Sequence, residues 1–167
     1  TVKLNAEVNN LRAFADMNML SLKPGVARMH LVNIGDATLT TAGIAAEYAR
    51  QANPVTFLGV AARGDCSWRD LRDQTARDAL SIYWQGAGSR VMYLTGSVSV
   101  FAELKPSAAF SVRWTGSRSQ RLPTHIENYG YFLYNPMDNS IYVGNPRLAP
   151  ERSWQSDVSF KWVSGMI

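Results

Sequence analysis

The chain has 167 residues, the usual length of one domain, and we expect residues 1–167 to form a single domain. Apolar residues make up 46% of the chain and charged residues 18%, a balance that excludes a disordered protein. The formal net charge of +4 is spread along the sequence and forms no basic arm. A single cysteine, Cys66, excludes an internal disulfide. No apolar run is long enough for a membrane-spanning helix, so no membrane span is expected.

The first part of the chain predicts two strands and a helix. Residues 2–8 alternate between apolar and polar side chains, which is typical of a half-buried strand, and a weaker strand is predicted over 27–34. The Ala-rich stretch 41–51 carries its larger apolar residues at helical spacing. Pro54 pushes the residue before it away from helical angles, so the sequence predicts a helix that ends there.

The rest of the chain predicts one more helix among many short strands. Ser67 and Asp70 have the spacing of a capping box, so a helix is expected over Ser67–Gln74. The strands are expected at residues 54–62, 80–84, 90–95, 97–104, 108–115, 129–134, 140–143 and 157–162. Strands separated by turns and interrupted by two short helices indicate an all-β sandwich or barrel. The strand register between residues 54 and 104 stays open.

Few residues are candidates for chemistry. The two histidines, His30 and His125, lie far apart, and neither they nor Cys66 have metal-ligand spacing. Phosphate-binding glycine motifs are absent, so no cofactor and no metal are expected. We therefore expect the chain not to be an enzyme. A small β-barrel enzyme that uses His125 as its base remains the third hypothesis.

Two arginine-containing segments are candidates for binding. Arg63, Gly64 and Asp65 form the tripeptide that integrins recognise, and they are expected on a turn between a strand and a helix, where a receptor could reach them. The basic residues of a Ser-rich segment are candidates for contact with RNA phosphates, provided that the segment is an exposed loop. These residues are Arg113, Arg118 and Arg121.

The aromatic residues favour interfaces. Five tryptophans and seven tyrosines are many for one small core, so either some of them meet partners or all of them pack in the core and along its rim. A second hypothesis is a carbohydrate-binding or lectin-like β-sandwich, in which Trp114, Tyr129 and Tyr131 would form a platform for sugars.

Three segments resemble capsid proteins of the picorna-like viruses. Residues 157–165, an acidic residue followed by an alternating aromatic strand and a glycine, resemble the last strand of those jelly rolls. Residues 94–100 resemble an interior strand, and residues 64–71 resemble the segment near the jelly-roll entrance of insect members. Taking residues 2–8 as the first strand lets the whole chain follow that fold.

This resemblance implies an eight-stranded antiparallel jelly-roll β-sandwich with two short helices. It implies a structural coat protein that assembles with other capsid chains into an icosahedral shell around genomic RNA, in the host cytoplasm and then in the virion. A member with several small coat proteins, as in some plant viruses, suits the chain length. The residues expected in or near subunit interfaces are Trp154, Trp162, Tyr131 and Tyr134.

Overall fold

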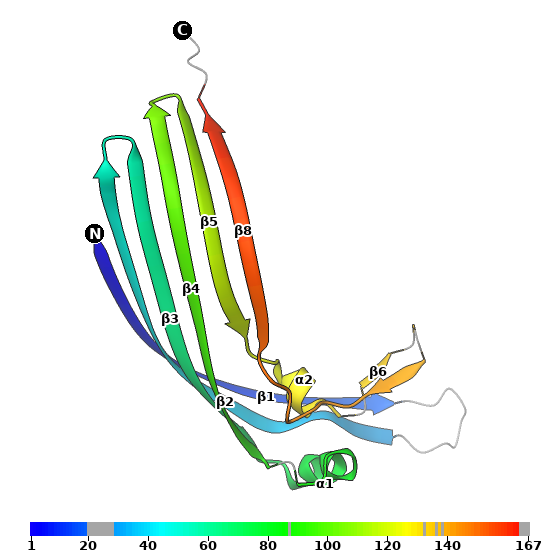
Figure 1. Cartoon of the computed structure of the whole chain (residues 1–167). Coiled ribbons are helices and arrows are strands. Elements are labelled where there is room, and N and C mark those ends of the chain that lie inside the picture. The colour runs from blue at the N-terminus through cyan, green and yellow to red at the C-terminus, as the bar shows by residue number, and fades with distance from the viewer. Residues whose placement is uncertain (20–28, 87, 132, 136, 138, 164–167) are drawn as a thin grey trace.

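A computed structural model describes residues 1–19, 29–86, 88–131, 133–135, 137 and 139–163. Antiparallel strands dominate it, and two short helices interrupt them (Figure 1). The strands are β1 (Val2–Met19), β2 (Met29–Asn53), β3 (Thr56–Leu71), β4 (Arg90–Ser107), β5 (Phe110–Arg121), β6 (Leu133–Asn135), β7 (Ser140–Tyr142) and β8 (Glu151–Trp162). The helices are α1 (Gln74–Tyr83) and α2 (His125–Tyr129).

Six of the strands form one sheet in the order β1-β2-β3-β4-β5-β8. Neighbours in the sheet are also neighbours in the chain, except that α2 and the hairpin β6–β7 lie between β5 and β8. Short turns join β2 to β3 and β4 to β5 at one end of the sheet, where β1 also begins and β8 ends (Figure 1). The connections from β3 to β4 and from β5 to β8, which carry both helices and the hairpin β6–β7, lie at the opposite end.

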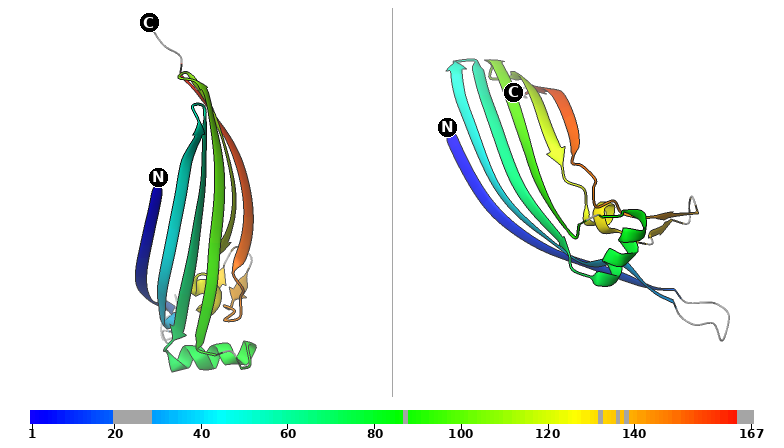
Figure 2. Two further views of the ribbon diagram at one scale, coloured as in Figure 1. Left: turned by 60° about the vertical axis from the view of Figure 1, so that its left-hand side comes forward. Right: turned by 60° about the horizontal axis from the view of Figure 1, so that its bottom comes forward.

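The sheet bends along its strands, and the long connections gather beside it. In Figure 1 and in the right-hand view of Figure 2, α2 and the hairpin β6–β7 lie on the inner side of this bend. Tyr93 on β4 and Arg69 on β3 make contact with the segment around α2. One side of the sheet therefore carries the connections, near one end only.

The jelly-roll sandwich is not confirmed. The all-β antiparallel class with two short helices is correct, but the described strands form one six-stranded sheet and a separate two-stranded hairpin. A jelly roll needs two sheets packed face to face, so that each buries the apolar face of the other. Here the large sheet keeps most of its apolar side chains exposed.

The predicted helix over 41–51 is wrong. This segment lies inside β2, which pairs with β1 on one side and with β3 on the other from Thr41 to Tyr48. Alanine has no polar side chain and fits either structure, so the hydrogen bonds to two neighbouring strands decide the outcome. The helical spacing of Ile44 and Tyr48 is also strand spacing, because four residues apart is one face in both structures.

The second predicted helix is displaced. Ser67 and Asp70 belong to β3, and Ser67 is fully buried there. The helix α1 begins after Asp73, whose carboxylate accepts a hydrogen bond from the backbone N–H of Ala76 at 3.2 Å. It continues through residues 80–83, where a strand was predicted. Strand residues at 2–8, 97–104, 110–115 and 157–162 are confirmed.

The hydrophobic core is small and lies under the long connections. Its members come from β2, β3, α1 and α2, and Trp84 and Val143 pack against them. The indole N–H of Trp84 donates to the carbonyl of Gly144 at 2.7 Å, which ties the end of α1 to the segment before β8. The buried members are Ala37, Leu71, Ala76, Leu80 and Tyr129. We call this core and the segments around it (residues 72–84 and 122–148) the cap.

A buried arginine joins the cap to the sheet. Arg69 on β3 is 3% exposed, and its guanidinium donates to the carbonyls of Pro123 and Thr124 and to the side-chain oxygen of Asn128. Asn128 in turn donates to the hydroxyl of Tyr93 at 3.1 Å. Burying a charge without a carboxylate is costly, so it persists only where such acceptors surround it.

Arg69→Ala is expected to loosen the cap without unfolding the sheet. The substitution leaves the carbonyls of Pro123 and Thr124 without their donor, and hydrogen bonds to a charged group contribute about 1.5–3 kcal/mol. Hydrogen exchange at the amides of α2 measures this local opening. The control Arg90→Ala removes an exposed arginine that pairs with Asp70 at 3.5 Å, and it is expected to cost under about 1 kcal/mol. Equal exchange in the two variants would contradict the role given to Arg69.

Candidate functional site

The large sheet separates apolar from polar side chains onto opposite faces. Successive residues of a strand point to opposite faces, and residues paired between strands share a face. The pairing therefore follows one face across all six strands, as in the row Leu4, Ala46, Ala62, Val98, Arg118 and Trp154.

On one face, most of the large side chains are apolar and exposed. We call it the apolar face, and its middle is covered by aliphatic residues whose exposed fractions reach 77% at Leu4. Such an extent of exposed apolar surface marks a partner or a membrane. The exposed members are Val2, Leu4, Val8, Ile44, Tyr48, Leu58, Val60, Trp68, Met92, Leu94, Val98, Val100, Leu104, Trp114, Trp154, Val158, Phe160 and Trp162.

Tryptophans mark the two ends of this face on β8. Trp154 and Trp162 are 79% and 74% exposed, and Val158 and Phe160 lie between them on the same face. Beyond Trp154 the next residue on the face is Arg152, paired with Gln120 of β5. The apolar surface on these strands thus ends at a tryptophan, and polar residues follow.

The opposite face, the polar face, carries charges that pair with one another. Arg63 binds Glu7 of β1 and Asp65 of its own strand, the latter at 2.7 Å. Lys3 pairs with Glu47 at 3.6 Å across β1 and β2. The guanidinium of Arg113 lies 4.2 Å from the centre of the Phe101 ring. The cap packs on this same face. Ser67, Arg69 and Leu71 of β3 point to the polar face, and all three are buried there.

The integrin-type tripeptide does not lie on a loop tip. Residues 63–65 are in the middle of β3, paired with both β2 and β4. Arg63 and Asp65 point to the polar face and bind each other, whereas Gly64 faces the other side. The expected turn between a strand and a helix is wrong, because the strand continues for six residues beyond Asp65.

The three candidate arginines do not form one loop. They belong to β5, where Arg113 and Arg121 lie on the polar face and Arg118 lies on the apolar face. Arg121 donates to Glu127 and to Glu151, at 2.9 and 3.0 Å. A Ser-rich sequence is typical of a solvated loop, but serine also fits the polar face of a strand, and β5 pairs with β4 on one side and with β8 on the other.

The expected interface residues lie in two places. Trp154 and Trp162 are on the apolar face of β8. Tyr131 follows α2 and donates its backbone N–H to the carbonyl of Asn33, and Tyr134 is in β6. The proposed sugar platform is not formed, since Tyr129 is fully buried in the cap whereas Trp114 is on the apolar face.

His125 is part of the cap and does not belong to a metal-binding cluster of the described residues. Among the described residues, no group of three His, Cys, Asp or Glu side chains could hold a metal ion. His125 is 9% exposed, and both of its ring nitrogens lack a hydrogen-bond partner in the described part of the chain. Burial, together with the charge of Arg69, lowers the pKa of this imidazole.

The first turn of α2 is held by a capping box that the sequence reading missed. Glu127 accepts from the backbone N–H of Thr124 at 2.6 Å, and the Thr124 hydroxyl accepts from the N–H of Glu127. Hydrogen bonds from Arg121 and from Thr124 lower the pKa of the Glu127 carboxyl to about 2. The Thr-x-x-Glu spacing at residues 124–127 is a signal that could have located this helix.

Acid is expected to loosen the cap through His125. The unfolded segment binds a proton on this imidazole at a higher pH than the folded cap does, so stability falls as the pH drops below about 6.5. Glu127 contributes little in that range, because its carboxyl loses its stabilising contribution only as the pH falls toward its unfolded pKa of 4.5 and below. Hydrogen exchange at α2, corrected for intrinsic rates, should accelerate from about pH 7.5 to about pH 5. His125→Phe should remove this acceleration, and an equal response in that variant would contradict the assignment.

No helix in the described residues is long and apolar enough to cross a membrane. No curated protein and no solved structure shows significant similarity to the chain. The model of one protein family does match, over residues 24–166, and its description is "TonB dependent receptor-like, beta-barrel". This match overturns the resemblance to viral capsid proteins, with its shell, RNA and virion, and gives no support to a lectin. The chain belongs to the family of TonB-dependent receptor-like β-barrels.

Proposed function

We propose that this chain forms part of the wall of a bacterial outer-membrane β-barrel with a receptor or transport role, for which TonB is the partner. Membership of the family supports this role. The observation that carries the proposal is the separation of the two faces, with exposed apolar residues on one and paired charges on the other. A transmembrane barrel has this pattern, because lipid covers its outer face and water fills its interior.

The dimensions of the apolar face suit a bilayer. Trp154 and Trp162 are eight residues apart on β8, which is about 27 Å along the strand. At a tilt of about 40° this separation is about 20 Å along the membrane normal, whereas the apolar band of such barrels is about 25 Å tall. The apolar run of β4 from Met92 to Leu104 gives about 30 Å by the same reasoning. Rings of aromatic residues at the two membrane interfaces are the arrangement that these tryptophans fit.

The connections suggest an orientation. Barrels of this class have short turns on the periplasmic side and longer loops outside the cell. The short turns after β2 and β4 are then periplasmic, and the cap is extracellular. Since the cap packs on the polar face, it covers the inner wall at the outer mouth of the barrel.

The proposal requires further strands. The edges of the described sheet are β1 and β8, and backbone groups at an open edge cannot stay unpaired in lipid. Closed single-chain barrels have about eight strands or more, and the sheet here has six. Additional strands must therefore pair with both edges. In this role the chain supplies surfaces and no catalytic centre.

A matched pair of arginine substitutions tests the proposal. Val100 on the apolar face and Ser99 on the polar face are adjacent in β4, and neither has a charged residue opposite it. Val100→Arg is expected to cost about 2–4 kcal/mol if it lies near the bilayer midplane, and Ser99→Arg much less. Urea titration of the full-length protein folded into lipid vesicles measures both values.

The difference between the two losses in unfolding free energy decides the result. A larger loss for Val100→Arg supports a lipid-covered apolar face. The proposal fails if Ser99→Arg lowers the free energy of unfolding more than Val100→Arg does. It also fails if the protein stays in the soluble fraction of the cell and does not sediment with the membranes.

A further inference from the structure

The part of the cap that follows β5 lies over the polar face of the sheet. We call its residues 122–131 and 139–148 the lid. The hydroxyl of Tyr93 on β4 binds both parts of the lid, because it accepts from the side chain of Asn128 at 3.1 Å and donates to the carbonyl of Leu148 at 3.0 Å. Hydrogen bonds between polar groups therefore attach the lid to the inner wall, at the outer mouth of the proposed barrel.

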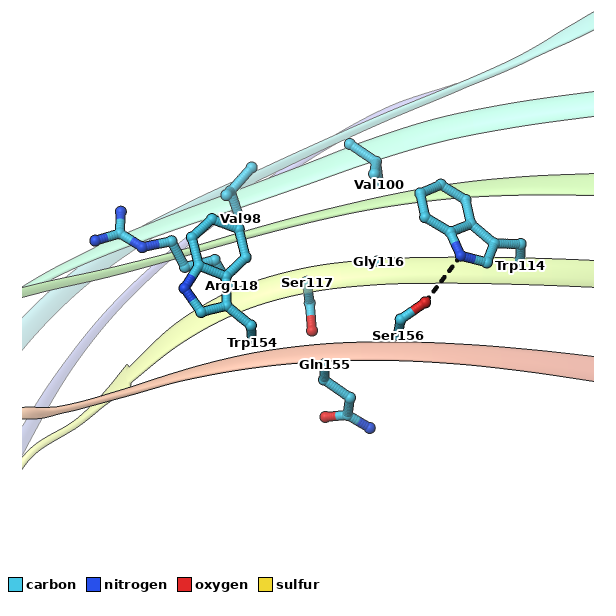
Figure 3. A pocket seen from close by; sticks show the side chains of 9 residues that line it. All are labelled: Val98, Val100, Trp114, Gly116, Ser117, Arg118, Trp154, Gln155 and Ser156. Carbon is cyan, nitrogen blue, oxygen red and sulfur yellow. Dashed lines mark hydrogen bonds between the residues drawn. The ribbon is translucent and has the colours of Figure 1, made fainter.

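The lid covers the inner wall and leaves the other side of the sheet open. Ser67, which is paired with Tyr93 on the polar face, is fully buried. The groove of about 420 Å³ between Trp114 and Trp154 in Figure 3 lies on the apolar face, away from the lid. A movement of the lid would therefore change access to the inner wall and to the lumen beside it, and not access to this groove.

The contact between the lid and β3 contains buried polar groups that lack a partner. Both ring nitrogens of His125, the hydroxyl of Tyr129 and the Nε of Arg69 have no hydrogen-bond partner among the described residues. None of these three residues is more than 9% exposed. Each such group destabilises the closed lid relative to an open lid, in which water would satisfy it. The closed lid is therefore poised to open.

The surroundings of His125 offer no carboxylate to a proton on its ring. On the polar face, the titratable groups next to the lid are Asp65, Arg69, Tyr93, Arg121 and Glu151. The lid itself and α1 add Glu127, Tyr129, Tyr131, Tyr142, Arg147, Asp73, Arg77, Asp78 and Tyr83. The five carboxylates among these residues all accept from other groups. The charge that acts on His125 is that of Arg69, which is positive.

Protonation of His125 therefore favours the open lid. In an open lid the imidazole is exposed to water and has its ordinary pKa of about 6.5, whereas burial and the charge of Arg69 lower its pKa in the closed lid. Between these two pKa values the open state binds one proton more, so the ratio of open to closed lids rises by at most about tenfold per pH unit of acidification. Below the lowered pKa both states are protonated, and the ratio levels off.

We propose that the lid closes the inner wall in neutral medium and is released in acid medium, with His125 as the proton receptor. Arg69 is the positioning residue: it donates to the lid at Pro123, Thr124 and Asn128, and it repels the imidazole once that ring is charged. Release uncovers the wall around Ser67 and regulates access to the lumen. This inference rests on the proposed function, which places the lid outside the cell.

Thiol labelling from outside the cell tests the release. In full-length protein in which Cys66 is replaced by serine, a single cysteine is placed either at position 67, beneath the lid, or at position 81, which is exposed on α1. Intact cells receive a water-soluble reagent that does not cross membranes, at pH values from about 7.5 to about 5. Dividing the labelling rate at position 67 by the rate at position 81 removes the shared effect of pH on thiols. We expect this ratio to rise by about threefold or more toward pH 5.

Two neutral variants and one matched control assign the response to its residue. His125→Gln and His125→Phe are expected to give a ratio that does not depend on pH, because neither side chain binds a proton. His30→Gln changes the other histidine of the chain and is expected to keep the full response. The heat-dependent shift of folded protein on a gel shows which variants are inserted. A response that persists in an inserted His125 variant overturns the proposal.

The remaining outcomes separate this inference from the proposed function. If position 81 is labelled in intact cells but the ratio for position 67 stays constant with pH, the acid release is wrong and the proposed function is unaffected. If position 81 is labelled only after the cells are lysed, the lid does not lie outside the cell. The proposed function then fails, and this inference fails with it.

Discussion

Side chains alternate between the two faces of the large sheet, and its fixed register keeps apolar residues on one face and charged residues on the other. The pairing of β3 with β4 runs from Thr56 to Asp70 without a shift. Shifts occur beside the short turns, between Gln51 and Asn53 and between Leu104 and Ser107, and at residues 13–16 of β1, outside the even pairing from Val2 to Ala13. A slip of one residue would move charges such as Arg63 onto the apolar face, where lipid could not solvate them. Long, unshifted pairing therefore keeps the two faces chemically distinct, and the proposed membrane position follows from that distinction.

The same alternation explains why the core is small and placed at one end. In a soluble sandwich, the apolar face of each sheet would be covered by protein, but here it stays exposed along six strands. The buried residues instead lie on the polar face under the cap, where Leu71 and Tyr129 meet. The polar face supplies few apolar contacts, so hydrogen bonds from Arg69 to Thr124 and from Asn128 to Tyr93 hold the cap in place. The cap's docking is accordingly the part of the structure most sensitive to burial of charge and to pH.

Sequence patterns predicted the all-β class and several strands correctly, but they did not predict what covers the apolar face of those strands. The alternation of residues 2–8 and 157–162 identified true strands, and the all-β class followed. The same alternation occurs in jelly rolls and in membrane barrels, because both put apolar residues on one face of a strand. Whether protein or lipid covers that face is a tertiary property, which explains the mistaken capsid assignment. Strand length was also missed, since small residues in 41–51 allow either structure. The contact of Arg69 with Asn128 joins residues 59 apart, so no local pattern indicates it.

Fluorescence quenching along β4 would show which face of the large sheet meets lipid and which meets water. Single cysteines at successive positions from Val98 to Phe101 would carry a fluorophore, in full-length protein in which Cys66 is replaced by serine. A quencher attached to lipid chains and a quencher dissolved in water would then be compared at each position. We expect the lipid-attached quencher to reduce the fluorescence at positions 98 and 100, and the aqueous quencher to reduce it at positions 99 and 101. Uniform quenching by the aqueous reagent at all four positions would contradict a membrane-facing sheet.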